Sequence, residues 1–524
     1  MLFGRVLARI QTGFLITHAM EDSMHPWQLA RATVLPGGVT SRHQFWLTDS
    51  LPAGARNIHR VYPPVTRLGV FLQGDATGEG GCSVSSFCSS IIALESGGYR
   101  LYYTAYSRGF GAMWIAVAES NDGLTWERRM LGQHRHDGSD TNRLVFDDFD
   151  AKQDFVGQPQ VLRLPDGSWR MYFWHHANGY RYTLAHSHDG LRWRIDRPAR
   201  WTFIDSGMNG KARLENGWEP DGSLPAAESA ELWRLKALRT NDASYVYFND
   251  ALNRFEYYAQ WMVPAHPDRR VEVDNCSQVH RYIQRRLSED GIVWSVPELV
   301  IMPDAQDSWD LQFYHLAVQW HEDWMVGSLG HYRVEGDQQT QDLELVFSRD
   351  GKSWHRPLRG GFIPRPARNS GARDREGIYP PNAWIDEGDT WLCLYTGTPV
   401  RHREALSKDP AHTTAIMGAR WRKQRLIGLA AGKVPGGFLS DVFCPQGDTI
   451  RIEADVRGWL RAELCDVFGR KLPGFHLMDS LSVEASGGPE TVLRWKDRPT
   501  TPFRYDMVRV RFEFSDAELY SLSF

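Results

Sequence analysis

The sequence predicts an all-β protein, a five-bladed β-propeller followed by a C-terminal β-sandwich, and three observations indicate this. The pattern Ser-x-Asp-Gly-x-x-Trp occurs four times, beginning at Ser120, Ser187, Ser288 and Ser348. Runs rich in aromatic and β-branched residues precede each copy, as expected of strands. After about residue 432 the runs become short and alternating. We therefore expect an N-terminal extension (1–65), a propeller (66–432) and a sandwich (433–524).

The spacing of the four copies favours propeller blades. Their starts lie 67, 101 and 60 residues apart, which is too far for ankyrin or leucine-rich repeats but suits one blade with a variable insertion. Asp-Gly is a strong hairpin signal because both turn positions tolerate positive φ. A fifth unit lacks the pattern but keeps the preceding strands, at 377–384 and 390–397. We expect the repeated Ser, Asp, Gly and Trp residues to shape turns and packing rather than to react.

The two ends of the chain differ from the blades. Alternating runs at 449–456, 460–467, 491–495 and 507–514, separated by turn residues, are typical of a β-sandwich. Residues 1–65 match no blade, so we expect them to pack on the propeller or on a neighbouring subunit. This extension and the long insertion at 215–238 leave room for a homo-oligomer.

Composition excludes several classes of protein. The chain has 524 residues, 42% of them hydrophobic, which is enough for a large core and more than one domain. A formal net charge of −4 gives no electrostatic case for nucleic acid binding. No apolar run is long enough to span a bilayer, and the six scattered cysteines suggest reduced thiols and no zinc site. We expect a cytoplasmic protein that needs no metal or cofactor.

Several motifs resemble a known family. The blade pattern, together with 437–443, Leu472-Pro-Gly-Phe and 519–524, is similar to five-bladed propeller glycoside hydrolases, the broad group that includes arabinanases, β-xylosidases, invertases and levanases. The resemblance covers roughly residues 65–524. It implies a hydrolase of carbohydrate metabolism, a glycosidase that cleaves an oligosaccharide such as one with a fructose or arabinose furanoside unit. The Trp-Met-Asn-Asp-Pro-Asn, Arg-Asp-Pro and Glu-Cys motifs of better-known members are missing, so their residues are not transferred.

The resemblance also implies a funnel along the propeller axis, where carboxylates at the start of the innermost strands meet one sugar. One acid protonates the leaving oxygen, and a second attacks the anomeric carbon or activates water. An acid precedes each expected inner strand, so the catalytic candidates are Asp75, Asp154, Asp242, Asp310 and Glu376.

Aromatic and polar residues near these acids are candidates for binding the substrate. Aromatic rings stack on the apolar faces of sugars, and amides and imidazoles bind hydroxyl groups. The candidates are Trp174, Trp309 and Tyr314 for stacking, and Gln158, Gln312, His315 and Asn382 for hydrogen bonding.

Two other functions remain open. A glycoside phosphorylase or transglycosylase shares the fold, and in a phosphorylase arginines such as Arg281, Arg285 and Arg286 would hold phosphate. A non-catalytic glycan-binding propeller would need no converging carboxylates, so the five acids argue against it without excluding it.

Overall fold

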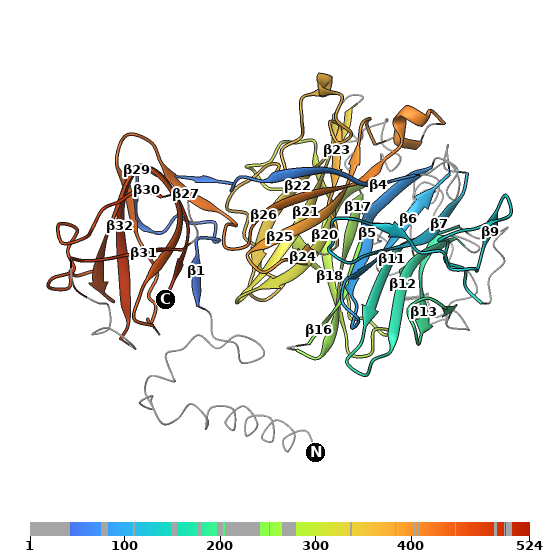
Figure 1. Cartoon of the computed structure of the whole chain (residues 1–524), viewed down its shortest axis with the longest axis horizontal. Coiled ribbons are helices and arrows are strands. Elements are labelled where there is room, and N and C mark those ends of the chain that lie inside the picture. The colour runs from blue at the N-terminus through green and yellow to red at the C-terminus, as the bar shows by residue number, and fades with distance from the viewer. Residues whose placement is uncertain are drawn as a thin grey trace, which may run out of the picture.

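The computed structural model is all-β. It describes residues 42–74, 82–107, 111–147, 155–176, 180–195, 203–204, 242–250, 252–264, 279–335, 338–382, 384–402, 404–406, 408–445, 447–486, 490–496, 498 and 506–524. Within these ranges the helices are short 3-10 turns, η3 (Arg368–Ser370), η4 (Glu404–Leu406) and η5 (Pro410–His412). Figure 1 shows the strands gathered in two bodies, with β27–β32 in one and most other strands in the second.

Three separate antiparallel sheets hold the first three expected units. In each, the strands follow one another in sequence order, as in a meander. The first sheet contains β5 (Ser83–Ala93), β6 (Tyr99–Tyr106), β7 (Met113–Ser120) and β8 (Glu127–Arg128). The second contains β11 (Phe155–Arg163), β12 (Trp169–His176), β13 (Tyr180–Ser187), β14 (Arg194–Ile195) and β15 (Phe203–Ile204). The third contains β16 (Ser244–Asn249), β17 (Arg254–Pro264), β18 (Val279–Ser288) and β19 (Glu298–Ile301). A small hairpin, β9 (Arg135–His136) and β10 (Ser139–Asp140), stands apart.

One eight-stranded sheet holds the fourth and fifth expected units together. Its strands are β20 (Leu311–His321), β21 (Trp324–Glu335), β22 (Gln338–Ser348), β23 (Gly377–Tyr379), β24 (Trp384–Asp386), β25 (Thr390–Thr398), β26 (Ala415–Arg422) and β4 (Thr66–Gln73). The two halves meet through one parallel pair, Gln341 with Gly377. Strand β4, from the N-terminal side of all the units, pairs with β26 near their end. This pairing ties the beginning of the repeated region to its last unit.

The sheets of these units form a closed circuit. Strand β5 contacts β11, β11 contacts β16, β16 contacts β20, and β25, from the same sheet as β20, contacts β5. The inner strands are irregular, because the pairing register shifts within β5, β11 and β20. Two residues in these irregular stretches, Cys88 and Gln158, have positive φ (52° and 55°), which is uncommon for residues other than glycine. The inner strands therefore present irregular backbone to their common axis.

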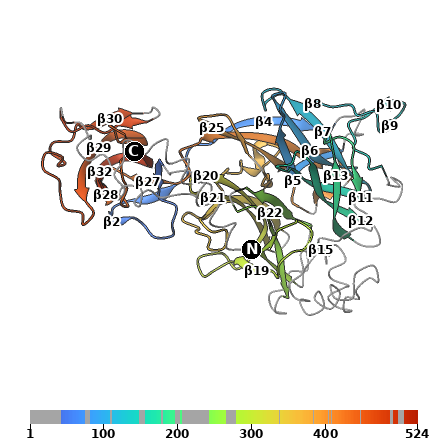
Figure 2. The same cartoon turned by 90° about the horizontal axis from the view of Figure 1, so that it is seen from below.

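The nine-stranded C-terminal sheet includes three strands from the N-terminal side of the chain. Its strands are β1 (His43–Phe45), β2 (Ala53–Arg56), β3 (His59–Val61), β27 (Gly428–Ala431), β28 (Gly436–Leu439), β29 (Arg451–Asp466), β30 (Val483–Ser486), β31 (Thr491–Val492) and β32 (Val508–Ser523). The long strand β32 pairs with β1, β27, β28 and β29. Strands β1 to β3 are thus part of this sheet, whereas the sequence predicted an extension that packs on the propeller or on a neighbouring subunit. Both views show β1 or β2 beside the C-terminal strands (Figures 1 and 2).

The repeated Ser-x-Asp-Gly turns lock neighbouring sheets together. Within the turn, Ser187 Oγ accepts a hydrogen bond from the N–H of Gly190 at 2.9 Å, and the side chain of Asp189 accepts two further backbone N–H groups. From the preceding sheet, Tyr102 Oη donates to the carbonyl of Gly190 at 2.6 Å, and Arg100 Nη1 donates to that of Asp189 at 3.2 Å. The repeat is therefore structural, as its sequence indicates.

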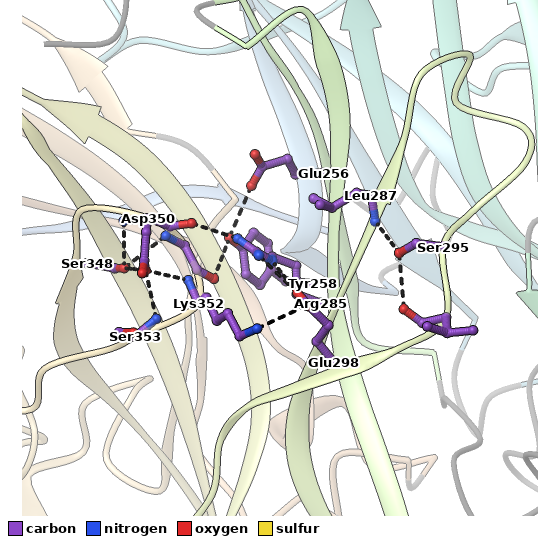
Figure 3. A network of polar contacts seen from close by, with 12 residues as sticks. Glu256, Tyr258, Arg285, Leu287, Ser295, Glu298, Ser348, Asp350, Lys352 and Ser353 are labelled. Atoms are coloured by element: carbon purple, nitrogen blue, oxygen red, sulfur yellow. Dashed lines mark hydrogen bonds and ion pairs between the residues drawn. The ribbon is translucent and has the colours of Figure 1, made fainter.

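We call this pair of hydrogen bonds, from a tyrosine and an arginine to the carbonyls of the Asp-Gly turn, the clasp. The clasp recurs at the next two joints between neighbouring sheets. Tyr172 and Arg170 bind the carbonyls of Gly291 and Asp290 at 2.8 and 2.6 Å. In the joint of Figure 3, Tyr258 binds the carbonyl of Gly351, and Arg285, from the neighbouring strand, binds that of Asp350 at 2.7 Å. Glu298 then pairs with both Arg285 and Lys352 across the joint.

Candidate functional site

Asp242 lies at the centre of the candidate site. It lies two residues before β16, the first strand of the third sheet, and the residue as a whole is partly exposed. One oxygen, Oδ2, accepts a hydrogen bond from Gln158 Nε2 at 2.8 Å, whereas Oδ1 has no hydrogen-bond partner in the described part of the chain. Burial raises the pKa of this carboxyl group above its ordinary value, against the opposing effects of the Gln158 hydrogen bond and the charge of Arg281. The carboxyl group therefore holds its proton more strongly than an ordinary aspartate.

A fully buried arginine lies beside this carboxyl group. Arg281, on β18, donates through Nη1 to Gln312 Oε1 at 2.7 Å. Its guanidinium carbon lies 4.8 Å from the ring centre of Tyr332 and 5.8 Å from that of Tyr314. Buried guanidinium groups favour such combinations of aromatic faces and hydrogen-bond acceptors. The arrangement fixes one positive charge near the Asp242 carboxyl group, whose pKa that charge lowers against the effect of burial.

Tyrosines surround Asp242 on its other sides. The charge of Asp242 and burial together raise the pKa of Tyr106, Tyr314 and Tyr379, burial having the larger effect. Tyr379 Oη lies 2.6 Å from Nδ1 of His402. These hydroxyl groups are neutral donors or acceptors at any ordinary pH, so they can hold sugar hydroxyls without adding charge.

Buried amide side chains join the inner strands below this cluster. Asn382 Nδ2 donates to Gln160 Oε1 at 2.6 Å, and Gln160 Nε2 donates to the carbonyl of Cys88. Gln260 Nε2 donates to the carbonyl of Tyr314 at 3.0 Å. These bonds connect four different sheets, because β5, β11, β17 and β20 each contribute a partner. They form a network of buried amide side chains that links the inner strands.

The other catalytic candidates are placed less centrally or lie outside the described residues. Asp310 directly precedes β20, is 8% exposed, and stands two residues before Gln312. Glu376 directly precedes β23 and pairs through Oε1 with Arg368 Nε at 3.1 Å. Asp75 and Asp154 fall outside the described ranges. The structure thus places three of the five acids at the starts of inner strands.

The binding candidates divide between the axis and the core. Gln158, Gln312 and Tyr314 belong to the cluster around Asp242. Trp174 is 1% exposed within the core of the second sheet, and Trp309 is 55% exposed before β20. His315 is wholly buried against Phe87, and burial lowers its pKa to about 3, so it is an uncharged core residue. Asn382 belongs to the network of buried amide side chains, through its hydrogen bond to Gln160.

Sequence reasoning missed several residues of the cluster. Tyr106, Tyr379, His402 and Gln160 were not selected, because none repeats from unit to unit. Gln160 lies two residues after Gln158 on the same strand, but the register shift between Gly157 and Gln160 and the positive φ of Gln158 interrupt the alternation that would place them on one face. Arg281 was considered only as a phosphate ligand.

The described residues contain no group of three or more His, Cys, Asp or Glu side chains arranged to hold a metal ion. Within the same residues, no helix has both the length and the apolar character required to cross a membrane.

No protein-family model and no curated protein matches the chain. Several solved structures are similar at low identity. A glycoside hydrolase aligns with a TM-score of 0.45 and 13% identity, over 68% of this chain and 92% of that one. An N-acetylgalactosamine deacetylase from F. plautii, in complex with blood group B trisaccharide, aligns with a TM-score of 0.41 and 15% identity, over 70% and 96%. Zg3597, a family 117 glycoside hydrolase from the marine bacterium Zobellia galactanivorans, aligns with a TM-score of 0.39 and 11% identity, over 68% and 90%. TM-scores this low assign neither an activity nor site residues to this chain.

Proposed function

We propose that this protein is a glycoside hydrolase in which Asp242 is the general acid. In this proposal the closed circuit of sheets is a five-bladed propeller, the eight-stranded sheet being two blades, and the C-terminal sheet is an accessory sandwich. The observation that carries the proposal is the Asp242 carboxyl group at the axis, which has a raised pKa and one buried oxygen, Oδ1, with no hydrogen bond to a described residue, in a residue that is partly exposed as a whole.

The chemistry of glycosidic cleavage explains why such a group is useful. The leaving oxygen must gain a proton as the bond to the anomeric carbon breaks, so the donor must stay protonated near neutral pH. Burial favours the protonated form of Asp242. Gln158 holds Oδ2, which fixes the orientation of the carboxyl group and leaves Oδ1 to carry the proton.

A second carboxylate must attack the anomeric carbon or activate water. We propose Asp310 for this role ahead of Glu376. Asp310 is two residues from Gln312, which is bound to Arg281 beside Asp242, whereas Glu376 is already paired with Arg368. Asp75 and Asp154 remain candidates from the sequence. The substrate class is an oligosaccharide, and a furanoside unit is the first choice for a screen.

The alternative reactions are outcomes of the same test. A phosphorylase would need an accessible cation for phosphate, but Arg281 is fully buried and bound to Gln312. Arg285 is held in the joint between two sheets, so it is committed elsewhere. Both observations favour water over phosphate as the acceptor.

The experiment is a screen of the full chain against nitrophenyl furanosides and pyranosides and natural oligosaccharides, with and without phosphate. Asp242→Asn is measured in parallel, because the amide keeps the shape and can still accept from Gln158. Release of sugar without phosphate, lost in this variant, supports the proposal. Turnover that requires phosphate identifies a phosphorylase, and glycan binding without turnover identifies a recognition module; either result contradicts the proposal.

A further inference from the structure

A second cavity lies far from the axial cluster, between the eight-stranded sheet and the C-terminal sheet. Its volume is about 780 Å³, within the range of small-molecule sites. Its walls come from residues 43–53, from the turns 323–324 and 349–355, and from 441–444, Met507 and Phe524. Figure 1 shows β1 at the edge of the C-terminal strands that faces the rest of the molecule.

The two sites are at opposite ends of one strand. Asp310 precedes β20, and Asp323 of the cavity follows it. A strand of 11 residues spans about 35 Å at roughly 3.3 Å per residue. The cavity is therefore separate from the proposed catalytic cluster, and one saccharide unit cannot occupy both.

Buried polar atoms in the cavity wall lack partners. The side chain of Asp323 is 4% exposed; Oδ2 pairs with Arg349, whereas Oδ1 has no hydrogen-bond partner in the described part of the chain. Trp46 Nε1 and Gln44 Oε1, from two other residues of the wall, also have no hydrogen-bond partner in the described part of the chain. Native proteins rarely leave such atoms unsatisfied without an ordered water, an ion or a ligand to bind them. These two acceptors and one donor are themselves shielded from solvent, so a bound molecule reaches them only if neighbouring side chains of the wall move.

The charge and the aromatic groups of the wall limit the class of ligand. The lining includes Asp323, Asp350 and Asp441 but a single arginine, Arg349, so an anion is disfavoured. Arg349 lies over the ring of Trp324, with its guanidinium carbon 4.2 Å from the ring centre. The rings of Phe443 and Phe524 lie 4.6 Å apart at another wall. A neutral molecule with many hydroxyl groups and apolar C–H faces suits both kinds of surface.

We infer that this cavity is a binding site for a neutral saccharide of one or two units, distinct from the catalytic cluster. The inference goes beyond the proposed function and does not depend on it, because it follows from the residues of the cavity alone. A site here would hold a glycan across two parts of the protein while leaving the axis open.

The test blocks the cavity with a bulky side chain and uses the repeat to supply a matched control. Ser353, exposed in the turn that lines the cavity, is changed to Trp. Val293 occupies the same position of the motif in the third sheet, is 73% exposed and lies far from the cavity walls; Val293→Trp is the control. Both changes are made in the Asp242→Asn background so that no probe is consumed, and a third variant, Asp323→Asn, alters the wall without changing its volume.

Binding is measured by isothermal titration and saturation-transfer NMR with glucose, galactose, mannose, arabinose, fructose, lactose, cellobiose and glucuronate. We expect a neutral sugar to bind to the control protein at least tenfold more tightly than to Ser353→Trp, with weaker binding by Asp323→Asn as well. We also expect glucuronate to bind more weakly than glucose. Equal affinity and stoichiometry in the Ser353→Trp and Val293→Trp proteins would overturn the inference. So would a preference for glucuronate, or the failure of every probe to bind the control.

Discussion

The joints between sheets and the cluster at the axis use similar residues in opposite ways. At the joints, tyrosine and arginine bind the carbonyls of Asp-Gly turns, and the arrangement is repeated at three places. At the axis, each polar residue occurs once, and some atoms are left unsatisfied among the described residues, including Asp242 Oδ1 and Asn382 Oδ1. The strained φ angles of Cys88 and Gln158 also fall at the axis. A repeated arrangement indicates structure, whereas unique groups with strained backbone and unsatisfied atoms indicate function.

The largest effect that this comparison predicts concerns activity. Asp242→Asn should lower kcat/KM for a substrate with an ordinary sugar leaving group by about 10²–10⁴-fold, the usual contribution of a general acid. Asp290→Asn is the matched control, because that carboxylate accepts hydrogen bonds from the Ser288 hydroxyl group and from backbone N–H groups of its own turn. The kcat/KM of the control should stay within about twofold of that of the parent. Equal losses of kcat/KM in both variants would contradict the assignment of catalysis to the axis and of structure to the joints.

The next effect concerns stability at a joint. Gly190 has a φ of 72°, and a Cβ atom there would lie 2.7 Å from Tyr102 Oη and 3.0 Å from Arg100 Nη1. Gly190→Ala should therefore lower the free energy of unfolding by about 1–3 kcal/mol, measured by chemical denaturation. Gly371 has a similar φ, 75°, with no atom near its Cβ position. Gly371→Ala should cost less, and an equal cost would mean that the clasp itself contributes nothing.

A smaller loss of stability should follow when one hydroxyl group of the clasp is removed. Tyr102→Phe leaves the buried carbonyl of Gly190 without its 2.6 Å hydrogen bond, at a cost of about 1 kcal/mol. Tyr99→Phe, on the same strand, is the control because its hydroxyl makes no hydrogen bond to a described residue. Neither variant should change kcat/KM, and a loss of activity in Tyr102→Phe would place the joint within the catalytic machinery.

The raised pKa of Asp242 predicts a dependence of stability on pH. The folded state holds this proton more tightly than the unfolded state, so the group contributes stability that is fully present below the unfolded pKa. That contribution is lost as the pH rises through the folded pKa. Asp242→Asn should therefore be more stable than the parent at pH 7, and the difference should shrink as the pH falls towards 3.8, the ordinary value. Thermal melts across this range check the sign, which a lowered pKa would reverse.

The smallest expected effect concerns Gln158, which orients the carboxyl group of Asp242. Gln158 donates to the charged form of Asp242 and so lowers its pKa. Removing the donor in Gln158→Leu should raise the pKa further and move the alkaline limb of the pH–rate profile to higher pH. Gln133→Leu, which removes the side-chain hydrogen bonds to the Leu191 carbonyl and the Val145 N–H, is the control and should leave the profile in place. A shift to lower pH would contradict this role for Gln158.

The sequence predicted the repeated part of the molecule better than the unique part. The turns beginning at Ser120, Ser187, Ser288 and Ser348 could be predicted because local chemistry determines an Asp-Gly turn. Strands β1 to β3 could not be assigned to the C-terminal sheet, because their partners lie more than 350 residues away along the chain. At the axis, position before an inner strand was enough to select Asp242 as a candidate. It could not find Tyr379 or His402, whose role depends on where several strands meet.

The most direct test of the central claim compares leaving groups in Asp242→Asn. The parent and the variant are assayed on two glycosides of the sugar found by the screen, one with a dinitrophenol leaving group and one with a simple alcohol. Dinitrophenolate departs without protonation, so the variant should keep activity on that substrate to within about tenfold of the parent. On the alcohol glycoside it should lose about 10²-fold or more. Equal losses on both substrates, or no loss on either, would contradict the assignment of Asp242 as the proton donor.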